Sequence, residues 1–457
     1  MILNKNIQEI YNLSNKENNI SDIQIFGEVN TPIDFVYKII DILPKCLFNN
    51  PNLRWLDTGA GTGIFSICLF YLLDEGLKDI IKENTERKNH ILSNQLFLIE
   101  IQNENIKILK NIFGENCNII EEDYINYNFD FKFDIIIGNP PFNCNGLKKV
   151  PTNNNIDKKN DGKTIWCDCI KKSINILKEN GILCYLVPSI WLKPDKQQIY
   201  NLLLKYQIYN LSCFSNTETN KIFKGKEQTP CCYFYLKKIH NNGFININDN
   251  LLKLNYNYPF KFGEPIPVCG YSIISKIKNF TYNFNCPLTV LKTNMPSNKI
   301  KLSNIKNNDF IFKNVKTCIL ENLNPKLVID YSDKPCSYYK DIKLILAHKM
   351  YGFPYLDRNG EFGISNRDAY IIKDKSIQEL EILQKFFSSK TALFLFESTR
   401  YRMKFLEKYI FELIPDITVL DNFPNTGNDL DIFKFFKFSE LECKTILNYH
   451  KQYKNFD

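Results

Sequence analysis

The chain has 457 residues, of which 44% are hydrophobic and 14% aromatic, so it can bury more than one sizeable core and is not a disordered protein. No apolar run of about 18 residues or more occurs, and the first residues contain no apolar segment of a signal peptide, so we expect neither membrane insertion nor secretion. We therefore expect an intracellular protein of two or three domains.

The net charge of +8 is carried by the second half of the chain. Residues 1–240 hold 28 Lys and Arg against 27 Asp and Glu, whereas residues 241–457 hold 30 against 23. A polyanionic partner for the second half is one interpretation, and general solubility is the other. The 15 cysteines stand mostly singly in apolar runs and the four histidines lie far from the closest cysteine pairs, so neither disulfides nor a metal site is expected.

Strand-like and helix-like segments alternate through the first half. The pattern predicts strands at 53–59, 96–101, 118–123, 133–139 and 181–188, and helices at 64–73, 103–113 and 166–180. Such alternation indicates an α/β fold, with a mostly parallel, doubly wound sheet covered by helices on both faces. Ligands of these sheets bind beyond the carboxyl ends of the strands, where this sequence places several unusual residues.

The first strand ends in "DTGAGTG" (57–63). Glycines at 59, 61 and 63 permit a tight turn that a ligand can approach closely, and Asp57 adds a carboxylate. The next strand ends at Glu100, where an acid can hold the two hydroxyls of a ribose. The separation from the glycines is longer than usual for dinucleotide sites, so a surface carboxylate is the alternative for Glu100. Asp123 ends the third strand.

The fourth strand runs into "GNPPFN" (138–143). Consecutive prolines fix the backbone and leave the Pro140 carbonyl without a competing N–H at the next residue. The side-chain oxygen of Asn139 is a second acceptor beside it, and Phe142 offers a flat apolar face. So rigid a strand end is expected to hold something still at the tip of the sheet, and the alternative is a proline-terminated strand with a core phenylalanine.

Together these motifs resemble the S-adenosylmethionine-dependent N6-adenine DNA methyltransferases, in the class whose target-recognition domain is C-terminal and which occurs in restriction-modification systems. "IIIGNPPF" is similar to their catalytic motif, and "FGEVNTP" (26–32) to the Thr-Pro element near the methionine end of the cofactor. The leading Asn favours adenine, because the enzymes that modify cytosine N4 usually have Ser there. The segment 166–192 is similar to the helix, strand and loop that follow the catalytic motif.

The resemblance implies a Rossmann-like methyltransferase domain over residues 1–240 and a mixed α/β DNA target-recognition domain over residues 241–457. It implies S-adenosyl-L-methionine as cofactor, bound by Thr31, Pro32, Asp57, Gly59, Gly61, Glu100 and Asp123, the last beside the cofactor's adenine. It implies catalysis by Asn139, Pro140, Pro141 and Phe142 on an adenine flipped out of double-stranded DNA and stacked on Phe142. Phe223, in a segment similar to the family's second aromatic element, is the candidate for the other face of the base, with core packing as its alternative.

The polar loop 143–164 contains Lys148 and Lys149 and is interpreted as either a linker or a flap over the DNA backbone. In the second half, polar residues 241–250 are expected to form the domain boundary, "DRNGEFG" (357–363) the turn of a hairpin, and 379–417 a helical region. Further candidates for DNA contacts are His348, Lys349, Arg358, Arg367, Arg400 and Arg402, each of which could instead be a solvated charge.

Other functions stay open at this point. Asn-Pro-Pro-aromatic motifs also serve methyltransferases of RNA and of protein glutamine, and a binding subunit could retain the fold without activity. No nuclease motif of the Asp…Glu-X-Lys type precedes residue 26, so any restriction nuclease is expected to be a separate partner. A monomer or weak dimer is expected.

Overall fold

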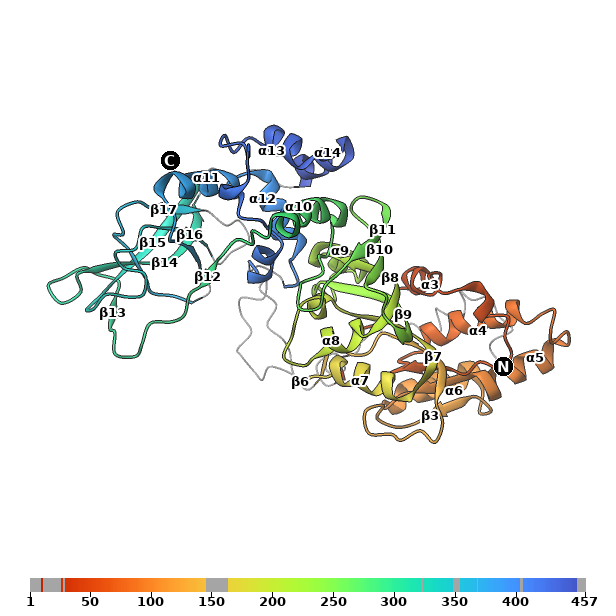
Figure 1. Cartoon of the computed structure of the whole chain (residues 1–457). Coiled ribbons are helices and arrows are strands. Elements are labelled where there is room, and N and C mark those ends of the chain that lie inside the picture. Colours follow the sequence, from red (N-terminus) through yellow and green to blue (C-terminus); the bar gives the residue numbers. More distant parts are fainter. Residues whose placement is uncertain are drawn as a thin grey trace. The chain divides into compact units, whose positions relative to one another are not determined.

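The computed structural model describes residues 10, 26–27, 29–144, 163–321, 324–347, 354–367, 369–402 and 406–449. It divides into two compact units (Figure 1). The first consists of Met1–Asn248 with Asn255–Phe262, and the second of Asp249–Leu254 with Gly263–Asp457. Among the described residues, no helix has both the length and the apolar character that a bilayer crossing requires.

The first unit is built on a nine-stranded sheet in the order β11-β10-β8-β9-β7-β4-β1-β2-β3. Its strands are β1 (Trp55–Thr58), β2 (Leu96–Ile99), β3 (Asn118–Ile120), β4 (Phe133–Gly138), β7 (Leu177–Pro188), β8 (Tyr206–Phe214), β9 (Cys231–His240), β10 (Phe244–Asp249) and β11 (Leu254–Pro259). The neighbours from β7 to β3 are parallel, whereas β9 is antiparallel to both β7 and β8. This is the mostly parallel α/β sheet that the sequence predicts.

Helices connect the parallel strands, and consecutive residues of the central strands are buried. The helices of this unit are α3 (Ile33–Ile40), α4 (Ile64–Gly76), α5 (Asn84–His90), α6 (Asn103–Phe113), α7 (Trp166–Ile176), α8 (Ile199–Leu204) and α9 (Asn216–Ile222), and a short ribbon pairs β5 (Asn143–Cys144) with β6 (Lys163–Thr164). In β4, Ile135, Ile136 and Ile137 are all buried, although their side chains alternate between the faces. Both faces of the sheet are therefore covered.

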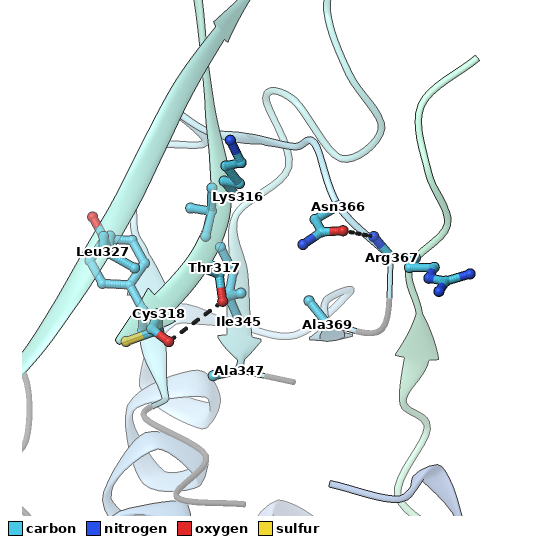
Figure 2. A pocket seen from close by; sticks show the side chains of 11 residues that line it. Lys316, Thr317, Cys318, Leu327, Ile345, Ala347, Asn366, Arg367 and Ala369 are labelled. Atoms are coloured by element: carbon cyan, nitrogen blue, oxygen red, sulfur yellow. Dashed lines mark hydrogen bonds between the residues drawn. The ribbon is translucent and has the colours of Figure 1, made fainter. Parts of the chain in front are cut away.

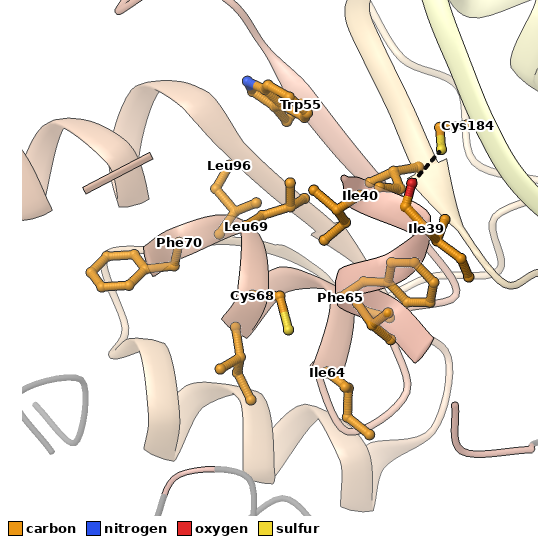
Figure 3. Close-up of a cluster of buried hydrophobic side chains, with 14 of the residues drawn as sticks. Ile39, Ile40, Trp55, Ile64, Phe65, Cys68, Leu69, Phe70, Leu96 and Cys184 are labelled. Atoms are coloured by element: carbon orange, nitrogen blue, oxygen red, sulfur yellow. Dashed lines mark hydrogen bonds between the residues drawn. The ribbon is translucent and has the colours of Figure 1, made fainter. Parts of the chain in front are cut away.

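The core on one face joins α3 and α4 to the central strands. Figure 3 shows Ile39 and Ile40 of α3 near Phe65 of α4, and Trp55 and Leu96 entering from β1 and β2. Because α4 begins at the glycine turn, this packing fixes the direction in which the helix leaves the sheet.

One sequence-based element boundary is wrong in the first unit. The helix expected over 166–180 ends at Ile176, and β7 already starts at Leu177, with Asn180 in a left-handed conformation (φ 64°) that a helix cannot contain. The polar stretch at 241–250 contains β10, in which Ile245 and Ile247 are buried and Asn246 between them is exposed, and the chain passes from the first compact unit to the second within this stretch, after Asn248. The functional division at residue 240 stays a prediction.

The second unit contains two four-stranded sheets and a helical core. Its elements are α10 (Tyr271–Phe284), β12 (Leu291–Lys292), β13 (Leu302–Ser303), β14 (Phe312–Glu321), β15 (Asn324–Ser332), β16 (Lys343–Leu346), β17 (Tyr355–Asp357), β18 (Gly363–Ile364), β19 (Tyr370–Ile372), α11 (Ile377–Phe387), α12 (Lys390–Ser398), α13 (Asp429–Phe436) and α14 (Glu440–Tyr449). The sheet orders are β12-β19-β16-β17 and β13-β15-β14-β18.

The hairpin expected around residues 357–363 does not form. β17 pairs with β16, and β18 pairs with β14 of the other sheet. The reason is Asp357, whose carboxylate accepts the backbone N–H groups of Glu361 and Phe362 and the ammonium of Lys343, so that the turn folds back on Asp357 itself. The helical region expected at 379–417 is divided at Ser389, which caps α12 by accepting the N–H of Ala392.

Candidate active site

The turn after β1 requires its glycines. Gly59, Gly61 and Gly63 have φ values of 68°, 55° and 89°, which side-chain-bearing residues rarely adopt. Gly63 precedes the first residue of α4, so the unpaired N–H groups at the start of that helix face the end of the sheet. The turn is therefore shaped to receive a ligand at the carboxyl ends of β1 and β2.

Glu100 holds the glycine turn and the end of β2 together. One carboxylate oxygen accepts the N–H of Gly61 at 2.7 Å, and the other accepts the N–H groups of Ile101 and Gln102 at 3.1 and 2.8 Å. The side chain is only 5% exposed. These contacts hold the Glu100 carboxylate in one orientation beside the glycine turn.

Asp57 lies beneath the turn and is 1% exposed, with the hydroxyl of Ser66 donating to its Oδ2 at 2.6 Å. Burial raises the pKa of Asp57 to about 7 against the opposing effect of the Ser66 hydrogen bond, and the charge of Glu100 contributes to the rise. At neutral pH this carboxyl group is therefore divided between its protonated and ionised forms.

This pKa makes the stability of the ligand-free protein depend on pH. The pKa of Asp57 in the folded protein exceeds that of an unfolded aspartate. The contribution of the protonated Asp57 to the free energy of unfolding is therefore complete below about pH 4, and it is lost as the pH rises through about 7. The side chain in Asp57→Asn is neutral at every pH, so this variant does not lose that contribution. The difference in free energy of unfolding between the variant and the natural protein should therefore shift in favour of the variant by about 2–4 kcal/mol between pH 4 and pH 8.

Urea unfolding followed by tryptophan fluorescence measures this difference, since Trp55, Trp166 and Trp191 all lie in the first unit. A difference between the two proteins that is constant over the whole pH window would contradict the raised pKa. Asp74→Asn, which changes an aspartate paired with Arg87 away from the turn, is the control.

The catalytic motif follows β4 and meets the Thr-Pro element. The Nδ2 of Asn139 donates to the hydroxyl of Thr31 at 3.1 Å, and Thr31 is buried. Pro32 stands directly before α3, where its carbonyl accepts the N–H groups of Phe35 and Val36. Two segments more than a hundred residues apart in the sequence are thus joined through one side-chain contact.

The oxygen of the same amide has no partner. Asn139 Oδ1 is buried and accepts no hydrogen bond from any described residue. A buried acceptor left unpaired costs about 1–3 kcal/mol, so proteins rarely keep one without a reason. With its nitrogen held by Thr31, Asn139 presents an orphan acceptor at the tip of the sheet.

The glycine turn and the catalytic motif approach each other closely. A Cβ atom placed on Gly59 would lie 3.7 Å from Cδ of Pro141, and one placed on Gly27 would lie 3.3 Å from Cβ of Pro141 and 1.9 Å from the carbonyl oxygen of Asn143. Gly27 also has φ 68°. The three motifs that the sequence separates therefore meet at one end of the sheet.

The remaining predicted site residues of this unit lie in different surroundings. Pro140 is buried, and Phe142 is half-buried at the edge of the core. Asp123 follows β3, and its carboxylate accepts the N–H of Ile125 and the amide of Asn126. Phe223 is 3% exposed and meets Phe35 edge-on, so its predicted stacking on a target base gains no support and stays a prediction.

Several buried hydroxyl groups around the site carry no recognisable sequence signal. Besides Ser66, a chain of hydrogen bonds runs from Thr58 through Tyr185 and Ser173 to Tyr124, with distances of 2.6, 2.7 and 2.7 Å. It links the residue before the glycine turn to the residue after Asp123. Its members come from separate elements, and no local pattern connects them.

The predicted DNA contacts of the second half are mostly compensated. Arg358, Arg400 and Arg402 form ion pairs with Glu381, Glu397 and Glu407. Arg367 lines a cavity, shown in Figure 2. Lys148, Lys149, His348 and Lys349 lie outside the described residues. Within the described part of the chain, no group of three His, Cys, Asp or Glu side chains could hold a metal ion.

The sheet, the glycine turn and the Asn-Pro-Pro-Phe tip define an α/β methyltransferase domain. Residues 66–223 match the Eco57I restriction-modification methylase family. This segment includes Glu100 and the Asn-Pro-Pro-Phe tip, and it begins just after the glycine turn. The matched segment lies within the first unit and runs from α4 to the end of α9.

Among curated proteins, the chain is similar to the type II restriction enzyme and methyltransferase RM.Eco57I of Escherichia coli, with 27% identity over 51% of this chain and 23% of that protein. It is also similar to an adenine-specific methylase of Mycoplasma pneumoniae, with 24% identity over 38% of this chain and 58% of that protein. The match thus spans less than two thirds of either relative. A solved type I restriction-modification methyltransferase subunit from Streptococcus thermophilus has 16% identity and a TM-score of 0.34, over 56% of this chain and 53% of that one.

Proposed function

We propose that the protein is a site-specific DNA methyltransferase that transfers a methyl group from S-adenosyl-L-methionine to the N6 amino group of an adenine flipped out of double-stranded DNA. The family of residues 66–223 supports the class of reaction. The orphan oxygen of Asn139 is the single observation that carries the assignment to an amino group.

An exocyclic amino group supplies what this oxygen lacks. Its two N–H donors match two acceptors, Asn139 Oδ1 and the Pro140 carbonyl, which consecutive prolines hold without rearrangement. Because Thr31 receives the Nδ2 of Asn139, the amide cannot easily turn its nitrogen toward the substrate. The pair of acceptors therefore selects a donor-rich nitrogen over a carbonyl or a methyl group.

The residues at the glycine turn fit the cofactor. The open cradle over Gly59, the oriented carboxylate of Glu100 and the buried Thr62 hydroxyl, which has no partner among the described residues, provide close approach and polar contacts. When bound, the cofactor supplies an electrophilic methyl group on a sulfonium sulfur. Asp57, Gly61 and Glu100 would hold it, with Thr31 and Pro32 near its methionine end and Asp123 near its adenine.

The chain's own contribution to transfer is positioning and fixed dipoles. Hydrogen bonds from the target nitrogen to Asn139 and Pro140 draw its lone pair out of conjugation with the ring and direct it toward the methyl group. Phe142 supports the base by stacking, an interaction of about 1–3 kcal/mol. After transfer the nitrogen loses one proton to water, and no strong base is required.

The second unit is proposed to recognise the DNA target, with a restriction nuclease as a separate partner and a monomer or weak dimer as the active form. Two alternatives remain in different classes. In the first, the methylated amino group belongs to a base of RNA or to the amide of a protein glutamine. In the second, the protein is a DNA-binding subunit that keeps the fold without transferring methyl groups.

Parallel transfer of a radiolabelled methyl group to DNA, RNA and protein distinguishes these functions. The proposal expects label in double-stranded DNA and background levels in the other two substrates. Label in RNA or protein alone would overturn the choice of substrate, and binding of DNA without transfer to any substrate would support the inactive subunit. The Asn139→Ala protein is the matched control for background.

A further inference from the structure

A small cavity in the second unit combines an apolar floor with polar groups at its edge. Buried side chains on the floor include Val315, Ile345 and Ala347, and the polar residues are Lys316, Thr317, Asn366 and Arg367. Figure 2 shows Asn366 and Arg367 on one side and the β14 residues Lys316–Cys318 on the other. At about 40 Å³ the cavity has room for a methyl group or a few waters but not for a whole base.

The segment that carries Asn366 and Arg367 is held rigidly. The hydroxyl of Thr293 donates to the carbonyl of Asn366 at 2.9 Å and accepts the N–H of Ala369 at 3.0 Å, and the N–H of Thr293 donates to the carbonyl of Ala369 at 2.9 Å. Asn366 Oδ1 accepts the N–H of Arg367. The Asn366 Nδ2 has no partner among the described residues, so an oriented amide donor faces the cavity edge.

A basic arm begins directly after Thr293. We define the basic arm as residues 294–316, which contain five lysines and one aspartate. Side chains of Lys299, Lys301 and Lys306 are exposed and form neither an ion pair nor a hydrogen bond with any described residue. Ile305 in the same arm is 73% exposed. Figure 1 shows the loops on either side of β13 extending from the sheet.

The arm and the cavity belong to one surface. Lys316 is the last residue of the arm and also lines the cavity. Its ammonium donates to Oδ1 of Asn304, earlier in the arm, at 3.4 Å. Thr293 connects the start of the arm to the Asn366 segment. In contrast, Arg358, Arg400 and Arg402 elsewhere in the unit are paired with glutamates. Three lysines whose side chains pair with no described residue therefore lie on the arm that leads to the cavity, where the Asn366 amide and the Arg367 guanidinium form the edge.

We propose that this surface reads double-stranded DNA, with Asn366 and Arg367 contacting base edges in the major groove and Lys299, Lys301 and Lys306 contacting phosphates. Amide and guanidinium groups match the acceptor and donor patterns of adenine and guanine edges, and the apolar floor fits the methyl group of a thymine. The lysines supply the sequence-independent attraction. This inference rests on the proposed function and assigns its target-reading residues.

The test compares two kinds of variant with a charge-matched control. The arm variant combines Lys299→Ala, Lys301→Ala and Lys306→Ala, and the control combines Lys45→Ala, Lys78→Ala and Lys444→Ala, three exposed lysines that are paired with carboxylates. Binding is measured from about 50 to 200 mM salt on a duplex that the natural protein methylates and on a duplex without that sequence. Circular dichroism confirms that each variant is folded.

The arm variant should weaken binding to both duplexes and reduce the slope of log affinity against log salt by about 2–3, while the control keeps the natural slope. Asn366→Ala and Arg367→Ala should each lower affinity for the methylated sequence by about 10- to 100-fold, leave the other duplex unchanged and relax the set of methylated sites at one or two positions.

An arm variant that binds DNA like the control would overturn the inference and would point to a protein as the partner of this surface. Unchanged site preference in both Asn366→Ala and Arg367→Ala would remove these residues from base reading. Both outcomes can be told apart from failure of the proposed function. If the proposed function is wrong, the natural protein itself transfers no methyl group to DNA.

Discussion

Asn139→Ala should reduce the rate of methyl transfer to DNA by about 10³-fold while changing the dissociation constant of S-adenosyl-L-methionine by less than about threefold. The reason is that one of two fixed acceptors for the target amino group is lost, and removal of a preorganised hydrogen-bonding group of this kind typically costs about 10²–10³ in rate. Single-turnover transfer of labelled methyl groups gives the rate, and calorimetry gives the affinity for the cofactor.

Asn139→Asp separates the acceptor role from a purely structural one. An aspartate keeps an oxygen toward the substrate, although it loses the N–H that donates to Thr31. It should therefore transfer methyl groups faster than the alanine variant and more slowly than the natural protein. Equal and nearly natural rates for all three proteins would remove Asn139 from the mechanism.

Glu100→Ala is expected to have the second largest effect, and it acts on the cofactor. The substitution removes the acceptor for the N–H groups of Gly61, Ile101 and Gln102, and with it the proposed contact to the ribose hydroxyls. Affinity for S-adenosyl-L-methionine should fall by about 10- to 100-fold, in line with the loss of hydrogen bonds to a charged group.

Transfer at saturating cofactor separates binding from chemistry in this variant. If Glu100 acts on the cofactor alone, the rate at saturation should stay within about tenfold of the natural value. Glu122→Ala changes an exposed acid beyond the next strand and should leave both quantities unchanged. An affinity of Glu100→Ala equal to that of the control would contradict the proposed role.

The sheet and the positions of its strand ends could be predicted because each depends on local pattern. Runs such as Ile135–Ile137 identify a strand buried on both faces, and glycines at 59, 61 and 63 identify a turn with positive φ. Parallel order then brings the carboxyl ends together without knowledge of any side-chain contact. The approach of the glycine turn to the Asn-Pro-Pro-Phe tip follows from topology.

The contacts that complete the site could not be predicted, since they join residues far apart in the chain. The hydrogen bond between Asn139 and Thr31, and the chain from Thr58 to Tyr124, depend on rotamers and on packing between elements. Phe223 shows the same difficulty, because a motif-like position does not determine whether an aromatic ring enters the core.

Charge in the second unit shows a further difference between composition and structure. Arginines 358, 400 and 402 are candidates for DNA contacts in the sequence, and in the fold they form ion pairs with Glu381, Glu397 and Glu407. Lys299, Lys301 and Lys306 of the basic arm look like ordinary solvated charges in the sequence, and in the folded unit their side chains pair with no described residue, whereas Lys313 pairs with Glu361. Sequence gives the sign of the net charge, whereas only the fold determines where it is left unpaired.

Nucleoside mass spectrometry of DNA incubated with the purified protein and S-adenosyl-L-methionine tests the central claim most directly. The two acceptors at the sheet tip predict N6-methyladenine, formed by the natural protein and reduced to background by Asn139→Ala. A product methylated at carbon 5 of cytosine, or N6-methyladenine formed at equal rates by both proteins, would contradict the account.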